Sequence, residues 1–591
     1  MNQNQTHNSK IYFCLSYLLF FIISFVYFGF IGDYILFFQE KNSLFIFSTD
    51  FLRENFHQPG GLLIYFGKFL STFFYYPIAG AAIVAIILTL IIFVISKIIS
   101  YLAGKTDIYI ALIIGISLFY LHTDYRFLLF NSLGILIQIS LFYLSIKYIT
   151  LIKGWIPILF IPLLYLFTGG FSWIFALMLT IYYVFRKDNI KWAKIIGLWV
   201  LSLVTFILSK EFLFFQSDVT LLLFPFSELS TGSQQILFLS IVGIISILPA
   251  IASISFSLPQ KLKFSEVSVW ILTTIVLSIF QVVLAFKRYD LKDSRYFYVE
   301  KLFYQNKFDD VIRYNTTNPP TNLLTIFLNN IALSETNKLN DLLFSFPQNP
   351  DGSTLFLKWE MVGEILKRGG YFYYTIGMIN EAHRWAFENM VMKGLTPEGL
   401  EMLIRTELIY GNYEVASKYI AVLKQTLFYT DEAKVFEKLL FNDVAVNSDN
   451  DLGEKRKEMI KSDFFTITDD PYINIERIMD KDSINKKAFE YKVAFMLLKK
   501  DFRGIANALP QFDRYGYTTL PVHVEEAALA LSVMNKGILP NLGKMKISKN
   551  TEFRWDQYLT IFQQYKTDPR SAEPALRKQF GNTFWYHAFY R

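Results

Sequence analysis

Long apolar runs alternate with short charged connections over the first half of the chain, whereas the second half mixes apolar and polar residues at helical spacing. A helix of about 20 apolar residues crosses the hydrocarbon core of a bilayer. About nine runs in the first half have the hydropathy of such spans: residues 11–31, 77–99, 107–122, 125–147, 155–168, 171–186, 192–210, 235–257 and 267–287. The pattern predicts a mainly α protein, in which a polytopic transmembrane helical bundle is followed by a soluble helical domain.

The fifth and sixth runs are separated only by Thr168-Gly169-Gly170. One helix from Trp155 to Phe185 would be about 46 Å long at 1.5 Å per residue, which exceeds a hydrocarbon core of about 30 Å. We therefore expect two short spans joined by a hairpin.

The change of pattern near residue 290 predicts two domains, a membrane domain over residues 1–289 and a helical domain over residues 290–591. The membrane domain has one long connection, residues 32–76, which is too polar for a span and too aromatic for a free loop. This first loop contains two amphipathic stretches, Phe45–Phe56 and Leu62–Tyr76, that are suited to the membrane interface.

Basic residues mark one set of connections. If the N-terminus lies in the cytoplasm, the even-numbered connections carry Lys97, Lys105, Lys147, Lys153, Arg186, Lys187, Lys191, Lys194, Lys261 and Lys263. Cytoplasmic loops carry such an excess of basic residues. This orientation places the first loop and the C-terminal domain outside. Four basic residues after the ninth span oppose it, but large domains are translocated regardless of such charges: Lys287, Arg288, Lys292 and Arg295.

Three segments of the second half share a polar turn, an aromatic residue, and then small or β-branched residues at helical spacing. They begin at Asn306-Lys307-Phe308, Gly411-Asn412-Tyr413 and Lys500-Asp501-Phe502. These segments resemble the inter-helix turn of tetratricopeptide repeats, in which the aromatic side chain lies between two antiparallel helices. The resemblance implies an irregular tetratricopeptide-like α-solenoid, whose concave surface would bind a partner protein or a glycan.

The chain ends in an aromatic segment, residues 584–590, with the sequence Phe-Trp-Tyr-His-Ala-Phe-Tyr. Two alternatives fit this composition, a packed last helix and an exposed docking peptide. The packed helix is the favoured interpretation.

Composition narrows the function classes. The 591 residues carry a net charge of +7 and include a single cysteine, Cys14. One cysteine excludes both an intrachain disulfide and a zinc site of the cysteine type. The basic residues form no dense block, so we attribute the positive charge to cytoplasmic loops and expect no nucleic-acid partner.

Polar side chains at the ends of spans are candidate functional groups, because a charge there costs free energy unless it reaches water or a partner. The first loop and the connection between spans three and four supply six of them: Asp33, His57, Gln58, His122, Asp124 and Arg126. Five of the six also fit a purely structural role. Asp33 fits a helix end, Asp124 and Arg126 fit an ion pair that caps a short turn, and both histidines fit satisfied interfacial residues.

Residues 58–80, QPGGLLIYFGKFLSTFFYYPIAG, are similar to the juxtamembrane part of the first loop of GT-C membrane glycosyltransferases, which use polyprenyl-phosphate-linked sugars. The resemblance implies that Asp33 is the general base for the acceptor hydroxyl and that Asp124 is a second catalytic carboxylate. No Asp-x-Asp or Asp-x-Glu pair follows the first span. We therefore assign no metal ligand and leave the cofactor open.

The same resemblance gives the remaining candidates substrate-binding roles. Arg126, with His57 or His122, would stabilise the departing lipid phosphate, and Gln58 would contact the substrate. Membrane lipids, including the polyprenyl-phosphate sugar, would then be the partners of the membrane domain.

The whole chain also resembles a family of Bacteroidota polytopic membrane proteins of unknown function. That resemblance implies a bacterial inner membrane, and the basic-residue pattern then predicts a cytoplasmic N-terminus and a periplasmic C-terminal domain. Two hypotheses remain: a GT-C-like glycosyltransferase, and a non-enzymatic scaffold in which a membrane anchor carries a helical-repeat domain for envelope proteins.

Overall fold

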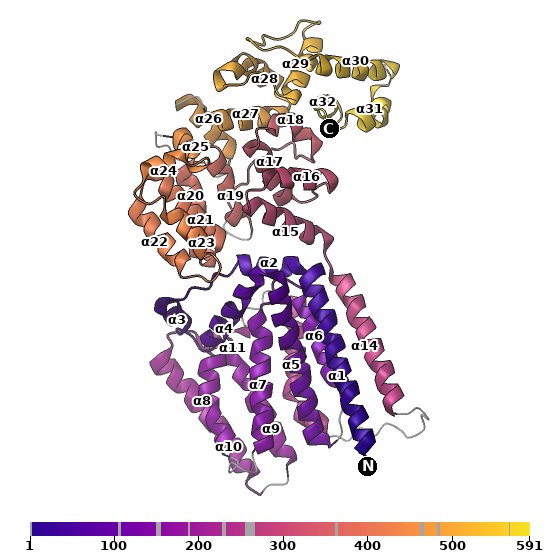
Figure 1. Cartoon of the computed structure of the whole chain (residues 1–591), viewed down its shortest axis with the longest axis vertical. Helices are drawn as coiled ribbons and strands as arrows, with labels where there is room; N and C mark the ends of the chain where they lie inside the picture. The colour runs from indigo at the N-terminus through magenta and orange to yellow at the C-terminus, as the bar shows by residue number, and fades with distance from the viewer. Residues whose placement is uncertain are drawn as a thin grey trace. The chain divides into compact units, whose positions relative to one another are not determined.

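The computed structural model describes residues 3–104, 108–148, 155–186, 189–226, 232–253, 266–360, 364–460, 466–467, 469–481, 485–565 and 568–591. Every regular element within these ranges is a helix, and none is a strand (Figure 1). The predicted mainly α fold is therefore confirmed. The chain forms two compact units. Unit 1 comprises Met1–Asp290 with Gln425–Phe428, and unit 2 comprises Leu291–Lys424 with Tyr429–Arg591.

Unit 1 contains the apolar helices. By length and composition, six helical segments of the described residues are long and apolar enough to cross a membrane: Tyr12–Ile31, Pro77–Ala103, Leu129–Tyr148, Ile156–Phe185, Lys191–Leu213 and Trp270–Arg288. The fourth of these segments contains a 3₁₀ turn, Gly169–Phe171, between two shorter helices. Two further predicted spans coincide with shorter apolar helices, Tyr109–His122 and Gln234–Ser246. These helices indicate a membrane protein, and the count of nine spans stays a prediction.

Some parts of the topology prediction fall outside the described residues. These are residue 107 of the third predicted span, residues 254–257 of the eighth, and the basic residues Lys105, Lys153, Lys187, Lys261 and Lys263.

The chain reverses at Gly169, between α8 (Ile156–Thr168) and α9 (Ser172–Phe185). Gly169 has a φ of +58°, which ends α8. Both flanking helices pack against α10 (Lys191–Leu208). Trp155 lies against Gly197 of α10, and Lys194 of α10 lies 5.8 Å from the ring of Tyr183. The start of α8 and the end of α9 therefore lie near one turn of α10, which shows the predicted hairpin.

Polar side chains join the apolar helices of unit 1. The helix α1 (Gln3–Val26) packs against α5 (Pro77–Ala103) and α14 (Glu266–Arg288) (Figure 1). Ser16 Oγ and Thr274 Oγ1 lie 3.0 Å apart, and Gln281 Nε2 donates to Ser24 Oγ at 3.0 Å. Small polar side chains that hydrogen-bond between helices stabilise helix pairs in an apolar environment.

The first loop is largely helical. It contains α2 (Asp33–Lys41), α3 (Thr49–Asn55) and α4 (Gly61–Thr72), followed by a 3₁₀ turn at Phe73–Tyr75. The second predicted amphipathic stretch thus matches α4. The first is helical only from Thr49, because Ser48 Oγ accepts the N–H of Phe51 and caps the helix there.

Unit 2 consists of helices, many of which are joined by short turns. They are α15 (Leu291–Tyr304), α16 (Phe308–Thr317), α17 (Leu323–Glu335), α18 (Leu339–Leu342), α19 (Ile365–Thr375), α20 (Ile379–Lys393), α21 (Pro397–Tyr410), α22 (Tyr413–Lys424), α23 (Thr430–Glu437), α24 (Asp443–Ser448), α25 (Leu452–Glu458), α26 (Pro471–Lys481), α27 (Lys486–Lys499), α28 (Phe502–Ala508), α29 (Val522–Met534), α30 (Lys549–Gln564), α31 (Glu573–Phe580) and α32 (Phe584–Tyr590).

Five of these turns have one geometry. In each, a residue with φ between +54° and +79° ends a helix, and the next helix begins two residues later: Asn306, Asn337, Gly377, Gly411 and Lys500. The N–H that follows the left-handed residue donates to the carbonyl five positions earlier, at 2.7 to 3.0 Å. This bond satisfies a carbonyl that the helix end leaves open. Neighbouring helices such as α19, α20, α21 and α22 pack in sequence order (Figure 1).

The last helix, α32, is packed. Phe584 and Trp585 are fully buried, and the indole Nε1 of Trp585 donates to the carbonyl of Glu526 at 2.7 Å. The favoured interpretation of the aromatic C-terminus is therefore confirmed.

Candidate functional site

The turn after α6 (Tyr109–His122) brings His122, Asp124 and Arg126 together, but each has a structural partner. His122 is buried, and its Nε2 lies 2.8 Å from Ser132 Oγ. Asp124 Oδ1 accepts the N–H of Arg126 at 2.9 Å and so caps its own turn. Its Oδ2 lies 3.5 Å from the guanidinium of Arg288 and also accepts the side-chain amide of Gln234.

The guanidinium of Arg126 packs over the ring of Tyr125, 5.3 Å from its centre. The backbone carbonyl of Tyr125 accepts the side-chain amide of Gln39, which also donates to Phe127. The bonds of this turn therefore connect it to α2 through Gln39 and to α14 through Arg288.

His57 and Gln58 occupy a second place in unit 1. His57 is exposed, and its Nδ1 lies 2.8 Å from the carbonyl of Arg53. The carbonyl of Gln58 accepts the N–H of Gly61, which forms the predicted turn. This turn lies against the α8–α9 hairpin, since the N–H of Gly60 donates to Leu166 at 3.1 Å.

Asp33 is the first residue of α2 and is half-buried. A carboxylate in the first turn of a helix interacts favourably with the helix dipole. This position agrees with the helix-end alternative. The catalytic role of Asp33 stays a prediction.

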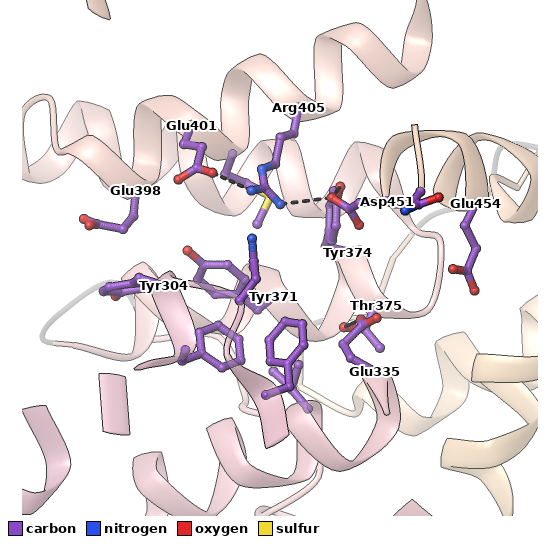
Figure 2. A pocket seen from close by; sticks show the side chains of 16 residues that line it. Tyr304, Glu335, Tyr371, Tyr374, Thr375, Glu398, Glu401, Arg405, Asp451 and Glu454 are labelled. Atoms are coloured by element: carbon purple, nitrogen blue, oxygen red, sulfur yellow. Dashed lines mark hydrogen bonds and ion pairs between the residues drawn. The ribbon is translucent and has the colours of Figure 1, made fainter. Parts of the chain in front are cut away.

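Unit 2 contains a cavity of about 260 Å³ (Figure 2). Its walls come from α15, the start of α16, α17, α19, α21 and the turn that leads into α25. Polar residues predominate on the α21 side, and aromatic residues predominate opposite them. We call this cavity the unit 2 pocket.

One wall of the pocket is a face of α21. Thr396 Oγ1 accepts the N–H of Gly399 and caps this helix, with Pro397 in its first turn. Glu398, Glu401 and Arg405 follow at helical spacing and face the cavity together (Figure 2). Arg405 Nη2 donates to Glu401 Oε1 at 2.5 Å.

The turn before α25 supplies the next wall. Asp451 Oδ2 accepts Arg405 Nη1 at 3.0 Å and the hydroxyl of Tyr374 at 2.7 Å. Asp449 Oδ1 accepts the N–H groups of Asp451 and Leu452, which holds the turn in place. Burial, together with Asp451, raises the pKa of Tyr374 well above its ordinary value, so its hydroxyl remains a donor.

Glu335 lies at a third side of the pocket, on α17. Its Oε1 accepts the hydroxyl of Thr375 at 2.7 Å and lies 3.2 Å from Lys455 Nζ. Burial opposes ionisation, but Lys455, Lys487 and the Thr375 hydroxyl together outweigh burial and lower the pKa of Glu335. The Lys455 side chain is itself buried, and it also donates to the carbonyl of Thr375 at 3.2 Å.

The aromatic wall comprises Phe303, Tyr304, Phe308, Tyr371 and Tyr374. Burial raises the pKa of Tyr371 well above its ordinary value, and Glu398 and Glu401 raise it further. Burial and Glu300 likewise raise the pKa of Tyr304. These tyrosines are therefore neutral hydrogen-bonding groups near physiological pH, not bases or nucleophiles.

Within the described ranges, no three His, Cys, Asp or Glu side chains converge as a metal site requires. Arg405 lies between the carboxylates of Glu401 and Asp451. The arrangement is suited to binding a small polar group.

Sequence reasoning missed the unit 2 pocket. Its residues come from separate segments between residues 303 and 454, so no local motif contains them. One signal was available: Glu398, Glu401 and Arg405 recur at i, i+3 and i+7 and must share one face of a helix.

Residues 8–591 match a single family along their whole length. The chain belongs to the family of unknown function DUF6057. No curated protein and no solved structure matches it. Membership of DUF6057 agrees with the expected family of unknown function, and it assigns no activity to any residue.

Proposed function

We propose that this DUF6057 protein is a membrane-anchored binding protein, in which unit 1 is the anchor and unit 2 is a tetratricopeptide-like solenoid that holds a segment of a partner protein. The proposal includes a bacterial inner membrane, which the family resemblance implies, and a periplasmic unit 2, which rests on the basic-residue pattern of the connections. The observation that carries it is the unit 2 pocket, which consecutive helical hairpins enclose.

The five turns of common geometry support a repeat architecture. The left-handed residues Gly377 and Gly411 lie one period of about 34 residues apart, the length of a tetratricopeptide repeat. Stacked hairpins of this kind place side chains from several repeats on one surface, where they bind extended segments of other proteins. The unit 2 pocket draws its walls from several hairpins in this way.

The glycosyltransferase hypothesis has less support from geometry. A catalytic pair needs side chains that are free to meet a substrate. Asp124 caps its own turn and pairs with Arg288, and His122 is buried against Ser132. Asp33→Asn in an assay of sugar transfer from a polyprenyl phosphate tests this alternative directly.

Photocrosslinking on the full-length protein in cells tests the binding function. A photoreactive phenylalanine at Asn450, which is exposed and lines the pocket, should form a covalent adduct with one defined protein. Glu454→Arg, a charge reversal of an exposed lining residue, should abolish the adduct. The same probe at exposed Lys546, outside the pocket, serves as the control. An adduct that survives Glu454→Arg, or that forms equally at Lys546, would overturn the proposal.

A further inference from the structure

Carboxylates outnumber cations around the unit 2 pocket. Five lining residues are acidic: Glu335, Glu398, Glu401, Asp451 and Glu454. The one basic lining residue of this pocket is Arg405, which is shared between two of these carboxylates. Lys455 compensates Glu335, and Lys367 interacts with Glu398 from behind the wall. Among these eight groups, the five carboxylates outnumber the three cations by two.

The side of the cavity opposite α21 is aromatic. The rings of Phe303 and Tyr371 meet edge to face with their centres 5.0 Å apart, and Tyr304 lies beside them. Aromatic faces attract ammonium and guanidinium groups, and the attraction grows when the cation is desolvated. Lys367 already shows this on the same ring system, with its Nζ 5.7 Å from the centre of the Tyr304 ring.

The volume of the cavity limits the occupant. At about 260 Å³ it lies just below the range of about 300–1,000 Å³ that is common for pockets of drug-sized ligands. One long side chain fits such a space better than a folded domain edge or a lipid headgroup with its chains.

We propose that the unit 2 pocket binds an organic cation, the ammonium or guanidinium group of a lysine or arginine side chain on the partner segment. The carboxylates of α21 and the Asp451 turn accept hydrogen bonds from the cation, and the Tyr304–Tyr371 wall contacts its methylene stem. This inference rests on the proposed function and names the chemistry that the partner segment presents.

Calorimetry on the full-length protein in lipid nanodiscs tests the inference with three capped tripeptides, Gly-Lys-Gly, Gly-Arg-Gly and Gly-norleucine-Gly. The basic peptides should bind at least tenfold more tightly than the norleucine peptide, and their affinity should fall as salt is raised. Glu454→Gln should weaken the binding of the basic peptides by up to about fivefold. Glu552→Gln removes the same charge from an exposed site outside the pocket and should leave binding unchanged. Equal binding of the norleucine peptide, or no binding of any peptide, would overturn the inference.

The two proposals fail separately. A pocket-dependent adduct at Asn450, without any preference for basic peptides, would support the proposed function and refute the binding of a cation. Butylamine that binds as tightly as Gly-Lys-Gly, with no adduct in cells, would keep the cation site and show that its ligand is a small amine. Absence of both the adduct and the preference for basic peptides would refute both proposals.

Discussion

Arg405 Nη1 donates a hydrogen bond to Asp451 Oδ2 at 3.0 Å and thereby ties α21 to the turn before α25. The same guanidinium bonds Glu401 at 2.5 Å. Burial opposes its charge, but Glu401, Tyr374 and Asp451 together outweigh burial and raise the pKa of Arg405 well above its ordinary value. The Arg405 guanidinium, which lines the unit 2 pocket, therefore also connects distant segments of the chain.

Arg405→Gln should loosen this connection. Breaking a fully buried ion pair costs about 3–5 kcal/mol. The Asp451 side chain is 40% exposed, so we expect Arg405→Gln to lower the free energy of unfolding by about 2 kcal/mol. Hydrogen exchange of the full-length protein should show faster exchange in α21 and α25. Arg313→Gln, which removes an exposed pair with Asp310, is the control and should change exchange very little. Equal effects of the two variants would show that Arg405 is not a structural connection.

Glu490 should make unit 2 sensitive to pH. Burial raises its pKa from 4.5 to about 7, although Lys487 and the hydroxyl of Ser334 partly oppose this. The unfolded chain releases the proton near pH 4.5, whereas the folded protein keeps it until about pH 7. The stability contributed by protonated Glu490 is therefore present below pH 4.5 and is lost as the pH rises to 7. The total loss is about 3 kcal/mol, from 1.36 kcal/mol for each pKa unit.

Glu490→Gln separates this effect from other titrations, since glutamine cannot ionise. The stability of the variant relative to the unmodified protein should increase between pH 5 and pH 8, read from the exchange rates of α27 amides. Glu552→Gln, at an exposed site, should follow the unmodified protein at every pH. Parallel profiles for Glu490→Gln and the unmodified protein would contradict a raised pKa.

The inter-helix turns show how far local sequence goes. Asn306, Gly411 and Lys500 were recognised because an aromatic residue follows each of them two positions later. The same backbone geometry occurs at Asn337 and Gly377, where Leu339 and Ile379 replace the aromatic residue, and these turns were missed. A left-handed residue and one hydrogen bond define the turn, whereas the aromatic side chain is only one way to fill the space between the helices.

The sequence predicts the candidate residues of unit 1 and misses the unit 2 pocket for a related reason. Span ends and charged loops can be recognised from a few consecutive residues, so His57, His122 and Asp124 are identified as candidates. Whether such a group is free depends on partners far away, such as Arg288 for Asp124. The unit 2 pocket is the opposite case, because Tyr304 and Asp451 meet only through the packing of separate hairpins.

Gly169→Ala should destabilise the α8–α9 hairpin. Its φ of +58° is unfavourable for alanine, and an added Cβ would lie 2.8 Å from the carbonyl oxygen of Pro59 and would also overlap that of Phe224. Gly104 has a similar φ of +66° but open space around it. Gly104→Ala should therefore cost only the backbone term, about 1–2 kcal/mol.

The yield of monodisperse protein after detergent extraction, with its thermal midpoint, measures both glycine variants. For Gly169→Ala, both the yield and the thermal midpoint should be well below those of Gly104→Ala. Similar values for the two would show that the contacts of Gly169 with the first loop and with Phe224 do not stabilise unit 1.

Trp585 should hold the C-terminal part of unit 2 together. It is fully buried, its indole N–H donates to Glu526, and its ring centre lies 4.8 Å from that of Trp555. Trp585→Ala should cost about 3–5 kcal/mol, as for other buried aromatic residues, whereas Trp585→Phe keeps most of the apolar contact and should cost about 1 kcal/mol for the lost hydrogen bond. Phe589 lies on the same helix but is 49% exposed, so Phe589→Ala is the matched control with a small effect. Hydrogen exchange of the α29 and α30 amides is the readout, because Trp585 contacts Glu526 of α29 and Trp555 of α30. Fast exchange in Phe589→Ala as well would mean that the whole of α32, and not the buried face of Trp585, provides the stability.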